Sequence, residues 1–446
     1  MEGFYIDELH EFGLQVDEDP IDEFLNEEDI ERLLEIETEL MGIDSSTNQV
    51  STNDEEAHRE AELLINEHNS VTDLLLMGAE ALEEQNWLKA SKVISKLYEV
   101  LDSTKQGEHE NAFDRLALFF TKGLHQKLDT YDPRKPLFHE EEEEEESTIF
   151  GKGNTMSAFQ MLQELTPYVK FAHFTANQAI FEATKDEQEI HIIDFDIMDG
   201  IQWPPLMIDL SLRQNASLKI TATTTSATNT AHQTGRRLKE FADSINLPFT
   251  FNHFVMTKEE DFNIITNQTG YIRSKVVANC IVNQFYMPQK NSSQVAIFLN
   301  GVKKLVPKII VLVEEELHSF SIKNNTSSSS KSFVELFCEA LHHYNAIDES
   351  LMSSFVNEYT MGIRMVENEL LGVKIISSLR NIRSGEVEKE ILKEFKQVRF
   401  SFGNVSQAKF LVGLFKGGYW VQNEHGRLAL CWNSKPLTVV SIWAPK

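Results

Sequence analysis

The sequence predicts an α/β fold in which helices wind a largely parallel sheet and a helical region precedes it. Short β-branched runs alternate with helical stretches from residue 189 onward, and apolar residues recur at helix spacing between residues 71 and 128. Strands that alternate with helices pair in parallel through right-handed crossovers. We therefore expect one α/β domain, with an acidic segment ahead of it.

The composition is that of a globular protein with a large acidic excess. Of the 446 residues, 41% are hydrophobic, which is enough apolar material for a large core. Acids outnumber bases 70 to 41, which gives a net charge of -29 at pH 7. This charge repels phosphate backbones, so nucleic-acid binding driven by overall charge is not expected, although a local basic face stays open.

Cysteine usage and the absence of apolar spans indicate the cytosol or the nucleus. Cys280, Cys338 and Cys431 lie far apart in apolar stretches, which predicts buried thiols rather than a disulfide or a zinc site. The N-terminal residues resemble no signal peptide, and no apolar run approaches the roughly 20 residues that span a bilayer. We expect no contact with a membrane.

Residues 1–65 form an acidic segment that we expect to be largely disordered. Its Lys and Arg side chains are Arg32 and Arg59, and its acids alternate with apolar side chains such as Phe12 and Phe24. Self-repulsion keeps such a chain extended. Two interpretations remain open: an activation segment whose apolar side chains enter a partner's groove, or a solvated tail with one amphipathic helix.

Residues 66–185 are predicted to be mainly helical. Three apolar runs with helix spacing, at 71–82, 90–101 and 113–124, are separated by short polar joins, which indicates antiparallel helices. An acidic linker covers residues 129–153 and contains seven consecutive glutamates, Glu140 to Glu146. Helix resumes over residues 155–183, with a break near Pro167.

The strand predictions follow from short β-branched runs bounded by charged or turn residues. They fall at residues 189–196, 217–225, 275–282 and 307–314. Helices are predicted from Pro204, over 233–245 and from Phe333, and a flexible loop over 323–331. The C-terminal residues 397–446 predict strands and one helix, with the last strands at 428–432 and 437–443.

The first predicted strand and the residues after it contain a recognisable motif. Residues 190–204 read Ile-His-Ile-Ile-Asp-Phe-Asp-Ile-Met-Asp-Gly-Ile-Gln-Trp-Pro. This stretch resembles the central VHIID motif of the GRAS family of plant transcriptional regulators, with Ile190 in place of the leading valine. The motif residues that we single out, as structural ones, are His191, Asp194, Asp196, Gly200, Gln202 and Trp203.

Further motifs lie in the family's order. Residues 170–180 are similar to the end of its first leucine-rich region, residues 234–238 to its second, and Ser441 and Trp443 occupy the place of its terminal SAW motif. Residues 407–415 resemble the nodulation-signalling subgroup. Two stretches depart from the pattern: residues 381–396 lack the usual PFYRE-type Arg and Glu cluster, and residues 222–225 lack the usual glycine turn.

The resemblance implies a methyltransferase-like Rossmann core of parallel or mixed sheet with a helical cap. It divides a GRAS domain, residues 66–446, into a leucine-rich region and cap (66–185), a VHIID core with the second leucine-rich region (186–320), a PFYRE-like region (333–396) and a SAW region (397–446). It also implies a nuclear regulator that contacts other GRAS proteins, transcription cofactors and DNA, the last either directly or through a partner. On this interpretation the leucine-rich helices pair with another subunit.

An enzymatic alternative has to be weighed, because Rossmann folds bind nucleotides and S-adenosylmethionine. Such a cradle needs a glycine-rich turn after the first strand, so that backbone N–H groups can approach the ligand. Here the turn, residues 196–200, holds one glycine, bulky Ile197 and Met198, and two carboxylates. We therefore expect no cofactor and no catalysis, and a small-molecule-binding or methyltransferase-like protein is the alternative.

The acidic and histidine residues were considered as metal ligands. Strand alternation places Asp194 and Asp196 on one face and His191 on the other. Carboxylates at a strand end bind loop backbone or cap a helix more often than they hold a metal, so we expect no metal site. The pair His342 and His343 is expected on a helix surface, where adjacent residues point about 100° apart.

Charge is distributed unevenly along the chain. Between residues 374 and 416 there are nine basic and four acidic residues, a local net charge of +5. A helix from Glu386 would place Lys389, Lys393 and Lys396 on one face, a candidate surface for DNA or an acidic partner. An ordinary solvent-exposed helix, whose Glu–Lys pairs serve solubility, is an equally good interpretation of this pattern. Arg236 and Arg237 form a second, smaller basic site, and no known base-reading motif is visible.

Overall fold

The computed structural model describes residues 70–105, 112–131, 152–225, 229–263, 276–288, 290, 292–319, 331–355, 360–380 and 390–446. All of them belong to the compact unit Ala61–Lys446. The predicted acidic segment 1–65, residues 132–151 of the acidic linker, residues 323–330 of the predicted loop and Lys389 lie outside the described residues.

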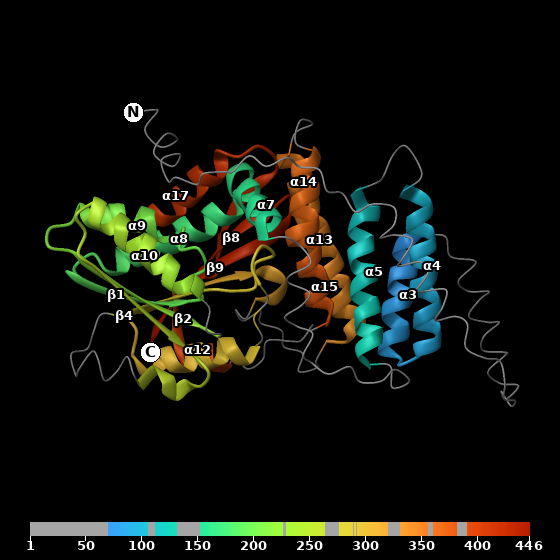
Figure 1. The fold of residues 1–446 in the computed structure, drawn as a ribbon, viewed down its shortest axis with the longest axis horizontal. Coiled ribbons are helices and arrows are strands. Elements are labelled where there is room, and N and C mark those ends of the chain that lie inside the picture. Colours follow the sequence, from blue (N-terminus) through green and yellow to red (C-terminus); the bar gives the residue numbers. More distant parts are fainter. Residues whose placement is uncertain are drawn as a thin grey trace, which may run out of the picture. The chain divides into compact units, whose positions relative to one another are not determined.

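A mixed sheet of nine strands forms the centre of the described chain (Figure 1). The strands are β1 Glu189–Phe195, β2 Ser217–Thr224, β3 Phe249–Val255, β4 Val276–Ile281, β5 Ile309–Glu315, β6 Phe395–Val398, β7 Tyr419–Glu424, β8 Arg427–Trp432 and β9 Lys435–Pro445. Their order is β3-β2-β1-β4-β5-β9-β8-β7, and β6 also pairs with β9. The first five are parallel and the rest antiparallel, which confirms the predicted Rossmann-like mixed sheet.

Helices cover both faces of this sheet. The helices and helical turns are α3 Val71–Glu83, α4 Trp87–Lys105, α5 Ala112–Tyr131, α7 Lys152–Leu165, α8 Tyr168–Ala183, α9 Trp203–Ser211, α10 Asn229–Ser244, α12 Ser292–Lys304, α13 Phe333–Ser354, α14 Thr360–Val366, a π-helical turn Glu367–Gly372, α15 Val373–Arg380 and α17 Phe402–Gly413. Alternation along β1 sends Ile190 and Ile192 into the larger core with α8, and Ile193 into a smaller core with α12.

The predicted helical region forms a cap of three packed helices, α3, α4 and α5. Most of their leucines pack between the three helices and against α13 and α15. The buried ones are Leu74, Leu75, Leu82, Leu97, Leu101, Leu116, Leu124 and Leu128. The ring of Phe120 meets that of Phe337 edge-on, with 5.4 Å between centroids. The cap therefore shares one continuous core with the sheet domain.

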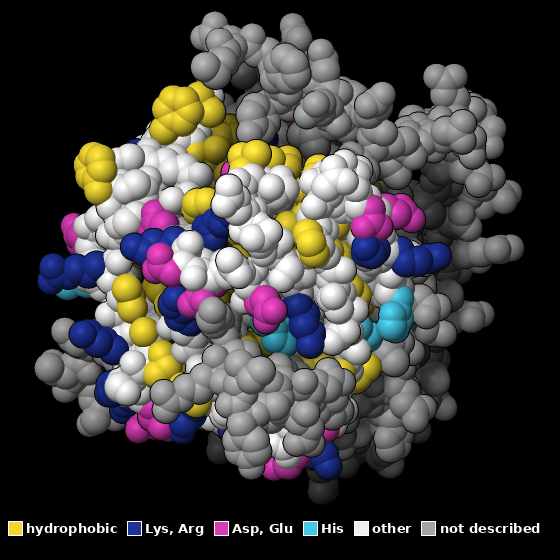
Figure 2. All heavy atoms as spheres, turned by 90° about the vertical axis from the view of Figure 1, so that its left-hand side faces the viewer, with side chains coloured by type: hydrophobic (Ala, Val, Ile, Leu, Met, Phe, Trp, Pro, Cys, Tyr) yellow, Lys and Arg dark blue, Asp and Glu magenta, His cyan; other side chains and the backbone are white. Residues whose placement is uncertain are grey.

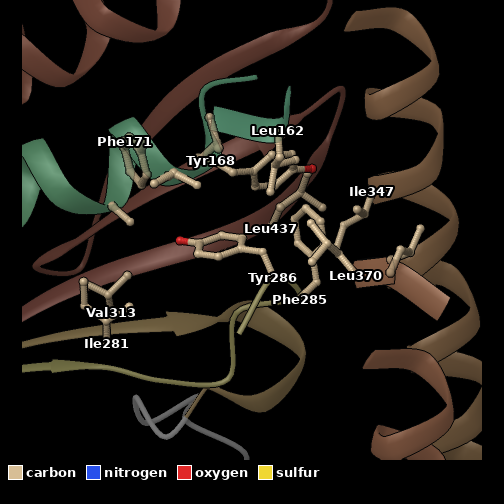
Figure 3. Close-up of a cluster of buried hydrophobic side chains, with 14 of the residues drawn as sticks. Leu162, Tyr168, Phe171, Ile281, Phe285, Tyr286, Val313, Ile347, Leu370 and Leu437 are labelled. Atoms are coloured by element: carbon tan, nitrogen blue, oxygen red, sulfur yellow. The ribbon is translucent and has the colours of Figure 1, made fainter. Parts of the chain in front are cut away.

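A cluster of large apolar side chains joins the two parts of this core (Figure 3). Leu162 and Tyr168 come from α7 and α8, Phe285 and Tyr286 follow β4, and Ile347 and Leu370 come from the helices on the other side. Tyr168 packs edge-on against Phe285 with centroids 4.9 Å apart. Such buried aromatic rings dominate core energetics, so this cluster fixes the spacing between the sheet and α13.

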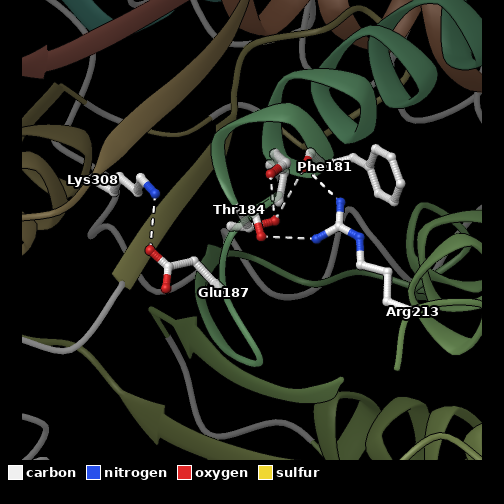
Figure 4. Close-up of polar contacts among 6 residues, drawn as sticks. Phe181, Thr184, Glu187, Arg213 and Lys308 are labelled. Carbon is white, nitrogen blue, oxygen red and sulfur yellow. Dashed lines mark hydrogen bonds and ion pairs between the residues drawn. The ribbon is translucent and has the colours of Figure 1, made fainter. Parts of the chain in front are cut away.

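Arg213 holds the end of α8 where the chain enters β1 (Figure 4). Its guanidinium donates to the backbone oxygens of Phe181, at 2.7 Å, and Thr184, at 2.8 Å, and lies over the Phe181 ring. A cation at the C-terminus of a helix satisfies otherwise unpaired carbonyls. Lys308 pairs with Glu187 at 2.9 Å on the same entry loop. The position of β1 is therefore fixed from its N-terminal side.

The structure corrects three of the predictions. Strand β3 was missed, and it pairs in parallel with β2 at the edge of the sheet. Lys396 does not continue a helix from Glu386: residues 390–392 are helical, the chain turns at Lys393, and Lys396 lies in β6 opposite Ala444 of β9. Pairing with β9 and burial of Phe395 override the local charge pattern.

The third correction concerns His343, which is buried and does not lie on a helix surface as predicted. Only His342 of the pair is exposed. His343 Nε2 lies 3.3 Å from Glu315 Oε1, at the end of β5. His343 is therefore buried beside a carboxylate from the sheet, a contact that the local sequence does not reveal.

Candidate functional site

The carboxyl ends of β1 and β4 carry a buried hydrogen-bonded network. Asp194, at the end of β1, accepts a bond from the Trp203 indole N–H at 3.0 Å and one from Asn279 Nδ2 at 2.8 Å. Gln202 bonds Asn279 and Asn177, with distances of 3.0 to 3.2 Å. All five side chains are at most 5% exposed. A fully connected buried network of this kind fixes one arrangement of the chain.

Burial has a strong electrostatic effect on Asp194. Desolvation raises its pKa to about 7, because this effect is larger than the lowering of the pKa by the hydrogen bonds from Asn279 and Trp203. Its role is to hold Trp203 at the start of α9, where Pro204 occupies the first turn. The predicted motif residues Asp194, Gln202 and Trp203 are therefore brought together, with partners Asn177 and Asn279 that the sequence analysis did not single out.

The loop after β1 is conformationally strained. Asp196, Met198 and Gly200 have positive φ values of 62°, 51° and 73°. A Cβ on Gly200 would lie 2.6 Å from Thr234 Cγ2, so the loop needs glycine at that position. Thr234 also donates to the Met198 carbonyl at 2.8 Å. Strain of this kind persists only where the surroundings hold it, and here α10 does so.

The carboxylates of this loop are all engaged with protein cations or donors. Asp196 Oδ2 forms an ion pair with Lys290 Nζ at 2.6 Å. Asp199 Oδ1 lies 3.6 Å from Arg237, which also bonds Thr234. Because Asp196 lies one residue beyond β1 with a left-handed φ, it leaves the strand alternation that was predicted for it.

A cavity of about 710 Å³ opens against this loop. It lies at the boundary between β1 and β4, where the strand order reverses, which is where open α/β sheets bind ligands. Loop residues 196–202 line one side, and residues from α7, the β4 exit and α15 line the others. A volume between about 300 and 1,000 Å³ suits a small organic molecule.

The wall opposite the loop is built by the π-helical turn Glu367–Gly372 and α15. Glu369 faces the cavity and accepts a bond from Thr155 at 3.1 Å, while Glu367 faces the cap, where Arg115 of α5 binds both of its oxygens at 2.9 Å. Asp348 lies beside Glu367, and burial together with the Glu367 charge raises its pKa to about 7. One turn therefore contacts both the cap and the cavity.

Lys374 is the most unusual residue of this wall. It is 2% exposed and lines the cavity, yet no described residue forms a hydrogen bond with its Nζ. Burial lowers its pKa, and the nearby Glu315 charge opposes that shift. The sequence analysis counted Lys374 only as part of a basic stretch. Nothing local in the sequence marks it, because its burial depends on the packing of α15 against α5.

The remaining motif residues have structural positions. His191 Nε2 lies 2.8 Å from Thr221 Oγ1 between β1 and β2. Ser441 and Trp443 lie on β9, where the Trp443 indole donates to Ser441 Oγ at 2.9 Å. In the described part of the chain, no group of three or more His, Cys, Asp or Glu side chains could hold a metal ion. No described helix is long and apolar enough to cross a membrane.

The candidate basic residues that the structure describes lie on different elements. Arg236 is exposed on α10, next to Arg237. Lys393 pairs with Glu390 at 2.5 Å, and Lys396 is exposed on β6. On the face drawn in Figure 2, Lys and Arg side chains are scattered among acidic ones rather than gathered in one patch.

Comparison with known proteins assigns the family. The GRAS domain family model matches residues 71–444. The chain is 36% identical over 395 residues to the protein NODULATION SIGNALING PATHWAY 2 of Medicago truncatula, covering 83% of this chain and 75% of that one. It is 33% identical to Scarecrow-like protein 26 of Arabidopsis thaliana, covering 77% and 71%.

A solved structure shows the same fold. The crystal structure of SCL7 from Oryza sativa superposes with a TM-score of 0.61 at 22% identity, covering 84% of this chain and all of that one. The VHIID-like strand and the second leucine-rich helix fall inside the matched residues 71–444, and so does the terminal strand apart from Pro445. This chain belongs to the GRAS domain family.

Proposed function

We propose that this protein is a plant transcriptional regulator of the GRAS type that acts in the nucleus through protein–protein contacts and associates with promoters. The observation that carries the proposal is the match of the GRAS family model to residues 71–444, with relatives that include NODULATION SIGNALING PATHWAY 2 and SCARECROW proteins. The geometry agrees with it, since the polar motif residues at the end of β1 are engaged in hydrogen bonds within the protein.

The same geometry argues against methyl transfer. The carboxylates after β1 are engaged by Lys290 and Arg237, and a single glycine, Gly200, fits against Thr234. A dinucleotide or S-adenosylmethionine cradle needs free backbone N–H groups in a glycine-rich turn. The proposed activity is therefore binding rather than catalysis.

The proposed partner is another GRAS protein, bound through the cap. Because most leucines of α3, α4 and α5 are buried inside the cap, the contact has to use outward-facing residues of these helices, such as Leu88 at the start of α4, which is 42% exposed. We expect Leu88→Glu to weaken association with a GRAS partner, measured by light scattering of the purified mixture. Leu212→Glu, on the exposed end of α9, is the matched control. Equal loss with both variants would contradict the cap as the interface.

Contact with DNA is proposed to depend on a partner. The net charge of -29 disfavours a phosphate backbone, and on the face drawn in Figure 2 the basic side chains are scattered among acidic ones. A mobility-shift assay with a promoter fragment should show weak binding by the protein alone and strong binding with a GRAS partner. Binding by the protein alone that is lost with K389E, K393E and K396E together would instead support direct contact. A fluorescent fusion tests the nuclear location.

A further inference from the structure

We propose that the outward side of α17 is a docking surface for an acidic amphipathic helix of a partner protein. This inference goes beyond the regulatory role and does not depend on the cap as an interface with another GRAS protein. Three observations support it: large apolar side chains are exposed on one side of a well-anchored helix, small residues lie between them, and the surrounding sequence contains bases but no acids.

The inner side of α17 fixes the helix to the rest of the domain. Its N-cap residue Ser401 accepts a bond from Asn404 N at 2.9 Å and donates to Glu182 of α8 at 2.7 Å. Asn404 Nδ2 donates to a backbone carbonyl of α8 at 3.1 Å, and Ala408 and Val412 are buried. A helix held along one side in this way presents its other side in a defined orientation, which reduces the entropy lost on binding.

The outward side of α17 exposes large apolar side chains to solvent. Phe402 is 89% exposed and Phe410 72%, and Leu414, directly after the helix, is 65% exposed. The helix contains one charged residue, Lys409, so it is largely apolar on both sides. Helices that are apolar all round are normally buried all round, and exposed apolar patches mark interaction sites. A partner that covers this side accounts for the pattern.

The exposed apolar side chains lie on the same side of the helix. At about 100° per residue, Phe410 lies about 80° and Leu414 about 120° around the axis from Phe402. The small exposed residues between them are Gly403, Ser406 and Gly413. A Cβ added to Gly413 would meet nothing within 4 Å, so the space above it is open. Small residues between large ones form grooves into which the side chains of a second helix pack.

The charges on and next to α17 are mainly basic. Residues 395–423 contain four basic and no acidic residues, in a chain whose net charge is -29. These four exposed bases are Lys396, Arg399, Lys409 and Lys416. Lys170 of α8 lies over the ring of Phe415, just beyond the end of α17, at 5.3 Å from its centroid. Complementarity of charge therefore favours an acidic partner.

An acidic amphipathic helix fits this surface better than the alternatives do. Its apolar side would cover Phe402 and Phe410, while its carboxylates meet Lys409 and Lys416 at the margins. A second copy bound through the same side would bring like charges together. An anionic membrane extends beyond the surface and would face the net negative charge of the chain, whereas one helix contacts only nearby bases, because salt screens charges beyond about 8 Å.

The surface is separate from the cap. α17 packs against α8 and β7, and Figure 1 shows it well away from α3, α4 and α5. A partner on α17 therefore leaves the outer side of the cap accessible to another GRAS protein. The two contacts are expected to form independently of each other.

The test uses the full-length protein and two synthetic peptides of about 20 residues, long enough to form a helix. Both carry leucines on one helical side, and the other side carries glutamates in one peptide and lysines in the other. Binding is measured by fluorescence anisotropy at about 0.15 M salt. We expect the acidic peptide to bind with a Kd below about 100 μM, and the basic one at least about tenfold more weakly.

Variants of the surface identify the contact. Phe410→Ser should weaken binding of the acidic peptide at least about tenfold. Lys409→Glu should weaken binding of the acidic peptide and strengthen binding of the basic one, which a purely apolar contact would not do. Met361→Ser, at a 73% exposed position on α14, is the matched control and should change neither affinity. Leu88→Glu should also change neither, so a failure of the cap interface and a failure of this surface are separate results.

Stability measurements exclude unfolding as the cause. Phe410→Ser and Gly413→Glu both change exposed positions, so both should lose peptide binding and keep the wild-type melting temperature within about 2 °C. No binding of the acidic peptide at about 1 mM, equal binding of both peptides, or unchanged binding by F410S would each overturn the proposal. So would a dimer that F410S dissociates, or binding of phosphatidylserine vesicles in place of the peptide.

Discussion

At the scale of single residues, the motif around β1 works mainly as internal structure. The Asp194 carboxylate accepts bonds from Trp203 and Asn279, and the strained loop that follows is held by Thr234 and Arg237. Polar residues that look like candidates for catalysis are thus already bound to one another. Side chains without partners, such as Lys374, are found elsewhere on the cavity wall.

Trp203 provides the first test of this view. It is fully buried and donates to Asp194, so Trp203→Phe should lower the free energy of unfolding by about 2 kcal/mol, from the lost bond and a small cavity. Urea unfolding followed by circular dichroism measures this. The same substitution at Trp420, which is 43% exposed and donates to the Asn433 carbonyl near the surface, should cost less than half as much. Equal costs would show that burial of Trp203 and its bond adds nothing to stability.

His191 gives a pH-dependent prediction. Burial lowers its pKa to about 3, with a smaller effect of Lys219, while the unfolded chain takes up this proton near pH 6.5. The folded pKa is the lower one, so the stability from His191 is present above pH 6.5 and is lost as the pH falls toward 3. The free energy of unfolding of His191→Gln, measured by urea unfolding, should therefore rise relative to that of wild type by about 2 kcal/mol between pH 7 and pH 5.

The control for this prediction is His342→Gln, on the exposed side of α13. Its free energy of unfolding should follow the wild-type curve at every pH. If the H191Q curve also ran parallel to wild type between pH 7 and pH 5, then His191 would already carry its proton in the folded protein, against the effect of burial.

At the scale of helices and strands, the π-helical turn and α15 link the cap to the cavity. Gly372 ends the turn where Phe119 of α5 packs against it, and a Cβ there would lie 2.4 Å from the Phe119 ring. Only glycine allows α5 and α15 to approach this closely. The contact between these two helices is one of the main connections of the cap to the sheet domain.

Gly372→Ala should therefore destabilise the protein by about 1–3 kcal/mol, because the ring has to move in a packed core. Gly413→Ala is the matched control: it lies at the end of α17, and nothing lies within 4 Å of its added Cβ. There the change should be neutral or stabilising by up to about 1 kcal/mol, since alanine favours helix. Chemical denaturation distinguishes the two, and equal effects would contradict the close packing.

The Arg115–Glu367 pair makes the same connection through charge. Both partners are largely buried, and Asp348 lies beside them. Arg115→Met should cost about 3–5 kcal/mol at pH 7, because it leaves two acidic side chains together without their cation. Adding Glu367→Gln should recover at least about 1 kcal/mol of this loss. If the double variant were as unstable as the single one, the charge would not be the cause.

The elements show what the sequence could predict and what it could not. Strands β1, β4 and β5 were predicted because parallel strands buried on both faces are mainly apolar, and β2 was predicted from its β-branched residues. β3 was missed because His253 and Asn252 interrupt its apolar pattern at the exposed edge of the sheet. Lys396 and His343 were misplaced since strand pairing with β9 and contact with Glu315 depend on partners far along the chain.

At the scale of the whole molecule, the cap and the sheet domain share one hydrophobic core. A single transition is therefore expected on unfolding, despite the presence of two architectural parts. Trp87 on α4 reports on the cap, and Trp443 on β9 reports on the sheet. Two variants that share the replacement of Trp203, Trp420 and Trp432, and that retain either Trp87 or Trp443 as the single tryptophan, should give the same urea midpoint by fluorescence. Midpoints that differ by more than about 0.5 M would mean that the cap unfolds by itself.

The π-helical turn determines which way α15 is rotated. A π turn contains one residue more than the α-helical path it replaces, and each helical residue advances the chain by about 100°. Without that extra residue, every side chain after Gly372 would swing by nearly a third of a revolution, and Lys374 would leave the cavity wall while Glu367 kept its bond to the cap. A deletion of one amino acid at this turn would therefore change the lining of the cavity and the packing of α15 against α5 together, while leaving the Arg115–Glu367 pair in place.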